Sequence, residues 1–353
     1  MSTTSFKCPN CGAAITYVPG TEHTKCPYCL SAHTLDALIA KQKEEATKAQ
    51  QSEIQERKPE IDQSALREYI CNSCGAQVVT DETTSSTICY YCHNPVIIND
   101  RISGEFLPDK IVPFQIDRDA AVERFLKWAR SKRYVPKDFT SPSNLEKITG
   151  IYLPYWVANA QAEMDIVGRG ENSRSWRTGD TEYTETKIYQ FERQGTIEVN
   201  NISELAYSKF DKDLLRSIEP YKAKQKRDFA LPYLTGFFAE RYDIGRQDVE
   251  GRLDERARRY ALSLARDSYS KYSNVRTERE QVDTQIVSWE YTLLPVWVLT
   301  YHYGSKTYVY AMNGQTGEAF GELPLNNRKL ALTSGVLFAA VAILVTLGGW
   351  LIW

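Results

Sequence analysis

The cysteines constrain this chain more than any other feature, because all eight fall into one pattern that occurs twice. Each copy has two C-x-x-C pairs separated by fourteen residues. The copies are Cys8, Cys11, Cys26 and Cys29, and then Cys71, Cys74, Cys89 and Cys92. Two such turns, brought together by a short hairpin, can surround a metal ion with four sulfurs. The spacing therefore predicts two zinc ribbons, each holding one structural Zn²⁺.

Other uses of the cysteines fit the sequence less well. Disulfides require an oxidising compartment, and "MSTTSFKCPN" has no apolar signal core. A redox C-x-x-C normally begins a helix inside a βαβ unit, which neither copy resembles. Three histidines (His23, His33 and His93) lie near the pairs. Because four thiolates already satisfy zinc, we expect closed, catalytically silent shells without histidine.

The charge of the chain bears on nucleic-acid binding, a common role of zinc ribbons. The 43 Lys and Arg residues against 45 Asp and Glu give a net charge of −2, and four thiolates would make each zinc site more negative. Neither ribbon carries the cluster of basic residues that phosphate binding needs. We therefore do not expect a nucleic-acid partner.

The C-terminal end is strongly apolar. Residues 330–353, "LALTSGVLFAAVAILVTLGGWLIW", contain no charge. At about 1.5 Å per residue, a helix of this length would reach about 36 Å, against about 30 Å for a hydrocarbon core. Arg328 and Lys329 precede it, so the positive-inside rule would place the N-terminal bulk in the cytoplasm. We expect a single-pass cell-membrane protein with a C-terminal transmembrane helix.

The remaining chain predicts an α+β fold: two small zinc ribbons, a mixed α/β middle domain with antiparallel strands, and the terminal helix. The expected boundaries are 1–40 for ribbon 1, 41–68 for a charged helical linker, 69–100 for ribbon 2 and 101–327 for the middle domain. The echo of "LPYWV" (153–157) in "LPVWV" (294–298) suggests a weak internal repeat.

Helices and strands of the middle domain follow from apolar periodicity. Helical spacing predicts an amphipathic helix over 118–133 with Asp117 as N-cap, and a long helix over 247–272. The packed face of the long helix is expected to comprise Val249, Leu253, Ala257, Tyr260, Leu264, Ser268 and Tyr272. A polar segment over 169–180 separates two strand-like regions, Gly304-Ser305 predicts a hairpin turn, and "NGQTGE" predicts a reversal.

No catalytic motif accompanies these elements. The sequence contains no phosphate-binding loop, no H-E-x-x-H, no G-x-S-x-G and no dinucleotide-binding glycine loop. Its carboxylates are numerous, but no pair is marked as an acid–base couple. We therefore expect a protein that is not an enzyme.

The order of motifs resembles that of a known family. The two ribbons, "VPFQID", "GIYLPYWV", "LPYLTGFFAERYD", "LLPVWVLTY", "NGQTGE" and the apolar C-terminus are similar to bacterial membrane proteins with transcription-factor-IIB-type zinc ribbons. The resemblance covers essentially the whole chain and implies phage-shock-protein-A-like and SPFH/flotillin-like partners at the lipid bilayer. It implies an adaptor in envelope-stress protection, with only the eight cysteines as functional positions.

Two further hypotheses remain open from the sequence. One is a membrane-tethered replication or transcription factor, which would bind nucleic acid in a salt-dependent manner. In the other, the ribbons only cap the middle domain, and the aromatic-rich β region is the binding module.

Overall fold

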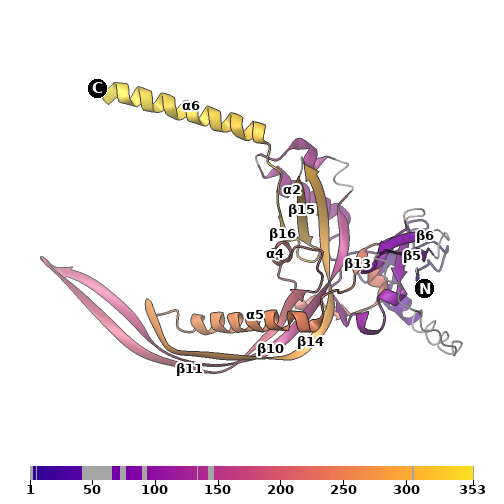
Figure 1. The fold of residues 1–353 in the computed structure, drawn as a ribbon, viewed down its shortest axis with the longest axis horizontal. Coiled ribbons are helices and arrows are strands. Elements are labelled where there is room, and N and C mark those ends of the chain that lie inside the picture. Colours follow the sequence, from indigo (N-terminus) through magenta and orange to yellow (C-terminus); the bar gives the residue numbers. More distant parts are fainter. Residues whose placement is uncertain are drawn as a thin grey trace.

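The fold is known from a computed structural model, which describes residues 3–4, 6–41, 66–71, 77–89, 94–132, 134–141, 147–303 and 306–352. In Figure 1 the N-terminal ribbon region lies at the right-hand end, and a long curved β arm and the C-terminal helix both extend toward the left. The centre of the molecule is a large sheet.

Eleven strands among the described residues form this sheet, in the order β1-β8-β7-β13-β10-β14-β15-β16, with β11 on β10, β9 on β14 and β12 on β9. Most pairs are antiparallel, but β10–β13 and β14–β9 are parallel. The strands are β1 Thr3–Thr4, β7 Thr84–Ile88, β8 Pro95–Ile98, β9 Lys110–Ile111, β10 Thr149–Thr178, β11 Thr181–Leu205, β12 Arg227–Asp228, β13 Phe238–Glu240, β14 Asn274–Tyr303, β15 Lys306–Asn313 and β16 Ala319–Gly321.

Smaller elements surround the sheet. Two further sheets comprise β2 Thr16–Tyr17, β3 His23–Lys25 and β4 Ala32–Thr34, and β5 Leu66–Ile70 and β6 Gln77–Asp81. Residues 35–41 are α-helical, and further α-helices are α2 Arg118–Arg130, α4 Lys212–Arg216, α5 Arg246–Asp267 and α6 Asn327–Ile352. Short 3-10 helices cover Asn99–Arg101, Gly104–Phe106, Lys137–Thr140, Ala223–Gln225 and Leu231–Leu234.

Three strands form the β arm, which comprises β10, β11 and β14. At about 3.3 Å per residue, the 30 residues of β10 extend about 100 Å. The segment 169–180, expected to interrupt the strands, instead continues β10 through Thr178 and turns at Gly179 and Asp180 into β11. Cross-strand pairing overrides its polar composition because this part of the arm is solvated on both faces.

Helix α5 packs on the arm through a row of small and branched residues. Its buried positions are Val249, Leu253, Ala257, Ala261 and Ala265. The first four pack on Ala158, Ala160 and Ala162 of β10, so the helix backbone approaches the sheet closely. Ala265 packs farther along the arm, with Ile166 and Phe191. The expected face was wrong at Tyr260 and Leu264, which are 47% and 54% exposed. The helix ends at Asp267 rather than at residue 272, and Tyr272, beyond its end, packs on Phe191.

Other local expectations are confirmed. Helix α2 begins after Asp117, whose carboxylate accepts a hydrogen bond from the Ala120 N–H at 2.8 Å. Phe125 of this helix is buried in the main core, which also contains Phe114, Phe237 and Trp297. The reversal at "NGQTGE" connects β15 to β16. Tyr303 pairs with Lys306, so a hairpin forms there, although Gly304 and Ser305 lie outside the described residues.

The expected transmembrane helix and single-pass membrane location are not supported. A helix does form in this region, α6, but within the described parts of the chain no helix is long and apolar enough to cross a membrane. The fold class is therefore corrected to a mixed α/β fold with a large sheet.

The expected linker, residues 41–68, lies mostly outside the described residues. Residues 35–41 are helical, and the range ends inside β5. The second cysteine region contributes β7 and β8 to the large sheet, where β8 also pairs with β1 at the N-terminus. The two cysteine regions thus meet at one edge of the same sheet.

Candidate metal centre

Two tight turns of ribbon 1 present the first four cysteines. In the first, the Gly12 N–H donates to the Cys8 carbonyl at 2.8 Å; in the second, the Leu30 N–H donates to the Cys26 carbonyl at 3.0 Å. Gly12 and Leu30 occupy the same place in each turn, and both have positive φ, +73° and +60°. Leucine rarely adopts this conformation, so the second turn holds a strained residue next to its cysteines.

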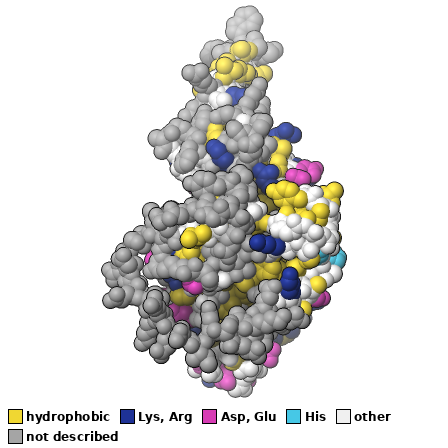
Figure 2. Space-filling model, turned by 90° about the vertical axis from the view of Figure 1, so that its right-hand side faces the viewer, with side chains coloured by type: hydrophobic (Ala, Val, Ile, Leu, Met, Phe, Trp, Pro, Cys, Tyr) yellow, Lys and Arg dark blue, Asp and Glu magenta, His cyan; other side chains and the backbone are white. Residues whose placement is uncertain are grey.

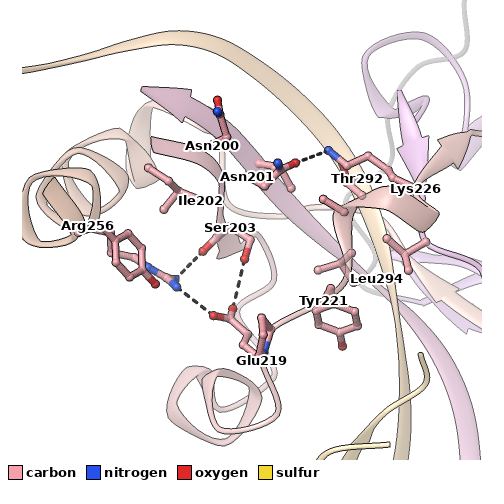
Figure 3. Close-up of a pocket in the computed structure, with 15 residues that line it drawn as sticks. Asn200, Asn201, Ile202, Ser203, Glu219, Tyr221, Lys226, Arg256, Thr292 and Leu294 are labelled. Atoms are coloured by element: carbon pink, nitrogen blue, oxygen red, sulfur yellow. Dashed lines mark hydrogen bonds and ion pairs between the residues drawn. The ribbon is translucent and has the colours of Figure 1, made fainter. Parts of the chain in front are cut away.

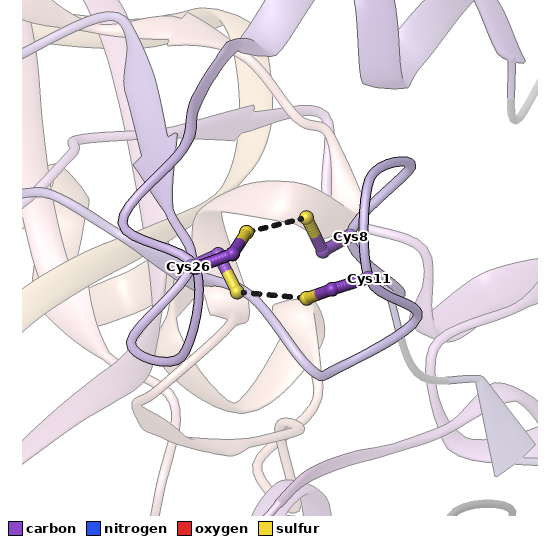
Figure 4. A group of neighbouring side chains, drawn as sticks. Cys8, Cys11 and Cys26 are labelled. Atoms are coloured by element: carbon purple, nitrogen blue, oxygen red, sulfur yellow. Dashed lines mark hydrogen bonds between the residues drawn. The ribbon is translucent and has the colours of Figure 1, made fainter.

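The four sulfurs form a compact cluster, drawn in Figure 4. All lie within 4.8 Å of one another, with Cys8 Sγ 3.6 Å from Cys29 Sγ and Cys11 Sγ 3.5 Å from Cys26 Sγ. With Zn–S bonds of about 2.3 Å, tetrahedral thiolates would be about 3.8 Å apart. The donor set and its spacing therefore fit a four-coordinate metal ion. Cys8 and Cys26 are buried, and Cys11 and Cys29 are exposed.

Ser31 and His33 lie directly beside the sulfurs. Ser31 Oγ is 3.2 Å from Cys8 Sγ and 3.0 Å from Cys29 Sγ, and His33 Nε2 is 3.4 Å from Cys8 Sγ. The Ser31 hydrogen bond, assisted by His33, lowers the pKa of the Cys8 thiol to about 5. From the sequence, His33 was expected to lie near the site but not to be a ligand. In the structure, the position of His33 is that of a hydrogen-bond partner of the Cys8 thiolate. Ser31 was missed, and its only signal is its place two residues after Cys29.

Ribbon 1 is anchored to the main domain by its β2–β3 turn. Tyr17 is buried, its N–H donates to the Thr235 carbonyl at 3.1 Å, and its ring meets Tyr233 edge-on at 5.3 Å. The Gly20 N–H donates to the Phe114 carbonyl at 2.9 Å. The metal centre is therefore attached to the core of the sheet domain through a buried aromatic contact.

The second set of cysteines is described only in part. Cys71 and Cys89 are buried together with Val78 and Val96 in one small cluster. Cys74 and Cys92 lie outside the described residues. Two of the four predicted ligands of the second site are thus brought to one place.

A buried charge cluster lies farther along the chain, where β11, α4 and α5 meet. Glu204 is 1% exposed and accepts hydrogen bonds from Arg216 at 3.0 Å and Arg252 at 2.9 Å, with Arg256 at 3.4 Å. Burial acts to raise the pKa of this carboxyl, but the three arginines, Arg216 first, bring it below its usual value. No local pattern signals this cluster, because its members are separated by long stretches of sequence.

Among the described residues of the ribbon region, basic side chains do not form a cluster. Figure 2 shows that face, where the coloured Lys and Arg side chains lie apart from one another among apolar and uncharged groups. The fold and the sulfur cluster together define a mixed α/β protein with a four-cysteine centre that could hold a metal ion.

Comparison with known proteins adds one relative. The chain is 29% identical over 350 residues to the "Uncharacterized protein YdjG" of Bacillus subtilis (strain 168), covering 98% of each chain. No family model matches the chain. No solved structure matches it either.

Proposed function

We propose that this chain is a non-enzymatic adaptor in which the four-cysteine centre holds a structural Zn²⁺ and the β arm docks partner proteins. The observation that carries the proposal is the end of the arm, an exposed two-stranded hairpin with unpaired edges. The metal centre supports the non-enzymatic part of the proposal, because four thiolates around one ion leave no position for substrate or water.

The end of the arm has the chemistry of a docking element. β14 begins at Asn274 opposite Glu171, so β10 beyond Glu171 pairs only with β11 among the described strands. Within the described structure β11 pairs only with β10, so its outer backbone edge is available for another strand. Trp176 and Tyr183 stack across the hairpin with ring centroids 5.8 Å apart and are 43% and 48% exposed.

Rigid aromatic side chains next to an open strand edge suit protein binding, because they bury a large area at little entropic cost. Charges of both signs flank the pair, including Arg174, Arg177, Glu182 and Glu185. This balance favours a protein partner over a phosphate backbone. The family resemblance makes phage-shock-protein-A-like and SPFH/flotillin-like proteins the proposed partners.

The experiment compares matched variants of the full-length chain. The double variant Trp176→Thr/Tyr183→Thr removes the aromatic pair and keeps strand-forming residues. Phe320→Thr, at a 48% exposed aromatic of β16, is the control. In pull-downs with purified candidate partners, we expect the double variant to lose at least tenfold in affinity and Phe320→Thr to retain it. Equal binding by both variants contradicts docking through the arm.

A second docking surface is favoured by the second cysteine turn, where Tyr28 and Leu30 are 73% and 68% exposed. Tyr28→Ser with Leu30→Asn keeps a residue that tolerates positive φ. If this variant loses binding while the arm variant keeps it, ribbon 1 is the recognition module. Binding that appears only with DNA or RNA, and falls steeply with salt, would instead support the nucleic-acid hypothesis.

A further inference from the structure

A cavity of about 180 Å³ lies between the sheet, α5 and the segment that follows α4 (Figure 3). Its floor comes from neighbouring strands, with Val157 of β10 and Thr292 and Leu294 of β14. Pro220 and Tyr221 line it from the segment after α4, and Arg256 lines it from α5. The cavity is independent of both the metal centre and the end of the arm.

Thr292, one of the residues that line this cavity, carries an unused hydrogen-bonding group. Its side chain is 0% exposed, and Oγ1 has no hydrogen-bond partner within the described structure. A buried hydroxyl left unpaired costs about 1–3 kcal/mol. Valine would fill the same strand position without that cost, so the hydroxyl is the feature of the floor that requires a partner.

The charged groups around the cavity are already paired. Lys226 Nζ forms an ion pair with Glu290 and donates to Asn201 Oδ1 at 3.0 Å. Arg256 Nη2 lies 2.9 Å from Glu219 Oε2, and its side chain is 11% exposed. Because each of these charged groups already has an opposite charge beside it, a charged ligand would enter without a counter-ion. The lining therefore favours an uncharged ligand.

Asn201, at the rim of the cavity, is held in a left-handed conformation by its hydrogen bonds. It has a positive φ of 58°, which asparagine tolerates better than most residues do. Its N–H donates to Asn159 Oδ1 at 2.8 Å, and its side chain accepts from Lys226. Residues fixed in such conformations by surrounding bonds are concentrated at binding sites.

We propose that this cavity binds a small uncharged molecule with an apolar body and one hydrogen-bonding group, which pairs with Thr292 Oγ1. At about 20 Å³ per non-hydrogen atom in a packed interior, the cavity holds about nine such atoms. The apolar side chains of Val157 and Leu294 contact the body, and Thr292 selects for the polar group.

The test uses two probes of equal size, benzyl alcohol and ethylbenzene, which differ in the hydroxyl. Each is titrated into methyl-labelled full-length protein and followed by NMR chemical shifts. The variant is Thr292→Val, and the control is Thr300→Val, the same change at an exposed position of the same strand. Since Thr292 Oγ1 has no partner, the variant is expected to fold at least as stably as the parent protein.

We expect Thr292→Val to weaken benzyl alcohol binding about fivefold to tenfold, to leave ethylbenzene binding unchanged or tighter, and to shift the methyl signals of Val157 and Leu294. Thr300→Val should change neither affinity. The proposal is overturned if neither probe binds the parent protein, if Thr292→Val changes both affinities equally, or if the shifts occur away from the cavity.

Discussion

Leu153 of β10 lies directly opposite Leu294 of β14 in the antiparallel ladder. Leu153 and Leu294 are the first residues of "LPYWV" and "LPVWV", which run in opposite directions from this pair. A local two-fold axis at the pair therefore relates the two motifs. Both prolines follow the symmetry, because the Pro154 carbonyl accepts from Ala206 N–H at 3.0 Å and the Pro295 carbonyl from Gly314 N–H at 2.9 Å. An internal repeat stays a prediction, but the register identifies where its two copies would meet.

The metal centre is tested first by removing one exposed ligand. Cys11→Ser alters the sulfur cluster without opening a buried cavity, since Cys11 is exposed. We expect the variant to bind one metal equivalent less than the parent protein, as measured by elemental analysis after dialysis. A chelator should also lower the melting temperature of the parent protein more than that of Cys11→Ser.

Ser31→Ala is the matched control, because it removes a contact to Cys8 and Cys29 but keeps all four sulfurs. Its metal content should equal that of the parent protein, with an affinity lower by about tenfold. Unchanged metal content in Cys11→Ser would contradict a four-cysteine centre.

The buried Glu204 cluster predicts how stability depends on pH. The folded-state pKa of Glu204 is lowered, so its contribution is present above the unfolded value of about 4.3 and is lost as pH falls through the folded value. We expect Glu204→Gln to lower the free energy of unfolding by about 2 kcal/mol at pH 7, with a smaller difference below about pH 4.

Glu255→Gln on α5 provides the comparison. Glu255 is exposed and lies 3.9 Å from Arg259, so the change should cost less than about 0.5 kcal/mol. Urea denaturation across the pH range distinguishes the two variants. A loss for Glu204→Gln that stays constant down to pH 3 would show that the charge of Glu204 is not responsible.

Two glycines, one in the arm and one in the helix that packs on it, predict changes of opposite sign. A Cβ at Gly170 of β10 would lie 2.3 Å from the Tyr272 ring, which stacks on Tyr189. Gly170→Ala should therefore destabilise by about 1–3 kcal/mol through overpacking.

Gly251 is a solvent-exposed residue within α5, away from the helix ends, and a Cβ there would meet nothing within 4 Å. Gly251→Ala should stabilise by about 1 kcal/mol, because alanine favours the helix. Thermal unfolding measures both effects, and a stabilising Gly170→Ala would mean that Tyr272 does not pack on the strand.

The sequence predicted what local spacing determines. The turns of ribbon 1, the Asp117 cap and the "NGQTGE" reversal each depend on neighbouring residues, and all three are confirmed. The face of α5 was predicted wrongly because hydrophobicity alone prefers Leu264 to Ala265. The contacts that bury Ala265, with Ile166 of β10 and Phe191 of β11, come from strands that are distant in the sequence.

Long-range pairings had no local signal. The polar end of β10 forms a strand only because β11 returns beside it, and β1 reaches β8 across nearly a hundred residues. The cavity at Thr292 and the arginines around Glu204 arise from the same pairings. A hydrophobic pattern predicted the terminal helix, but its character as a membrane span was not supported.

Asn313, in the "NGQTGE" reversal, and Asn172, in β10, use their side-chain amides differently. We therefore expect the same isosteric change, Asn→Asp, to affect stability differently at the two positions. Asn313 is 0% exposed; its Nδ2 donates to the Ile218 carbonyl at 2.9 Å, and its Oδ1 accepts from Gln315 N–H. Asn313→Asp would place a carboxylate oxygen against that carbonyl. We expect a loss of about 3 kcal/mol or more, because a buried charge would replace a donor.

Asn172 uses only its acceptor, which binds the N–H and hydroxyl of Ser273 at 2.9 and 3.1 Å. Asn172→Asp keeps this role and should change stability by less than about 1 kcal/mol. Urea unfolding of the two variants at pH 7 gives the comparison. Because Ile218 precedes the segment that lines the cavity, Asn313→Asp should also weaken benzyl alcohol binding, whereas Asn172→Asp should not. Equal stability of the two variants would mean that the Asn313 amide does not fix the segment after α4.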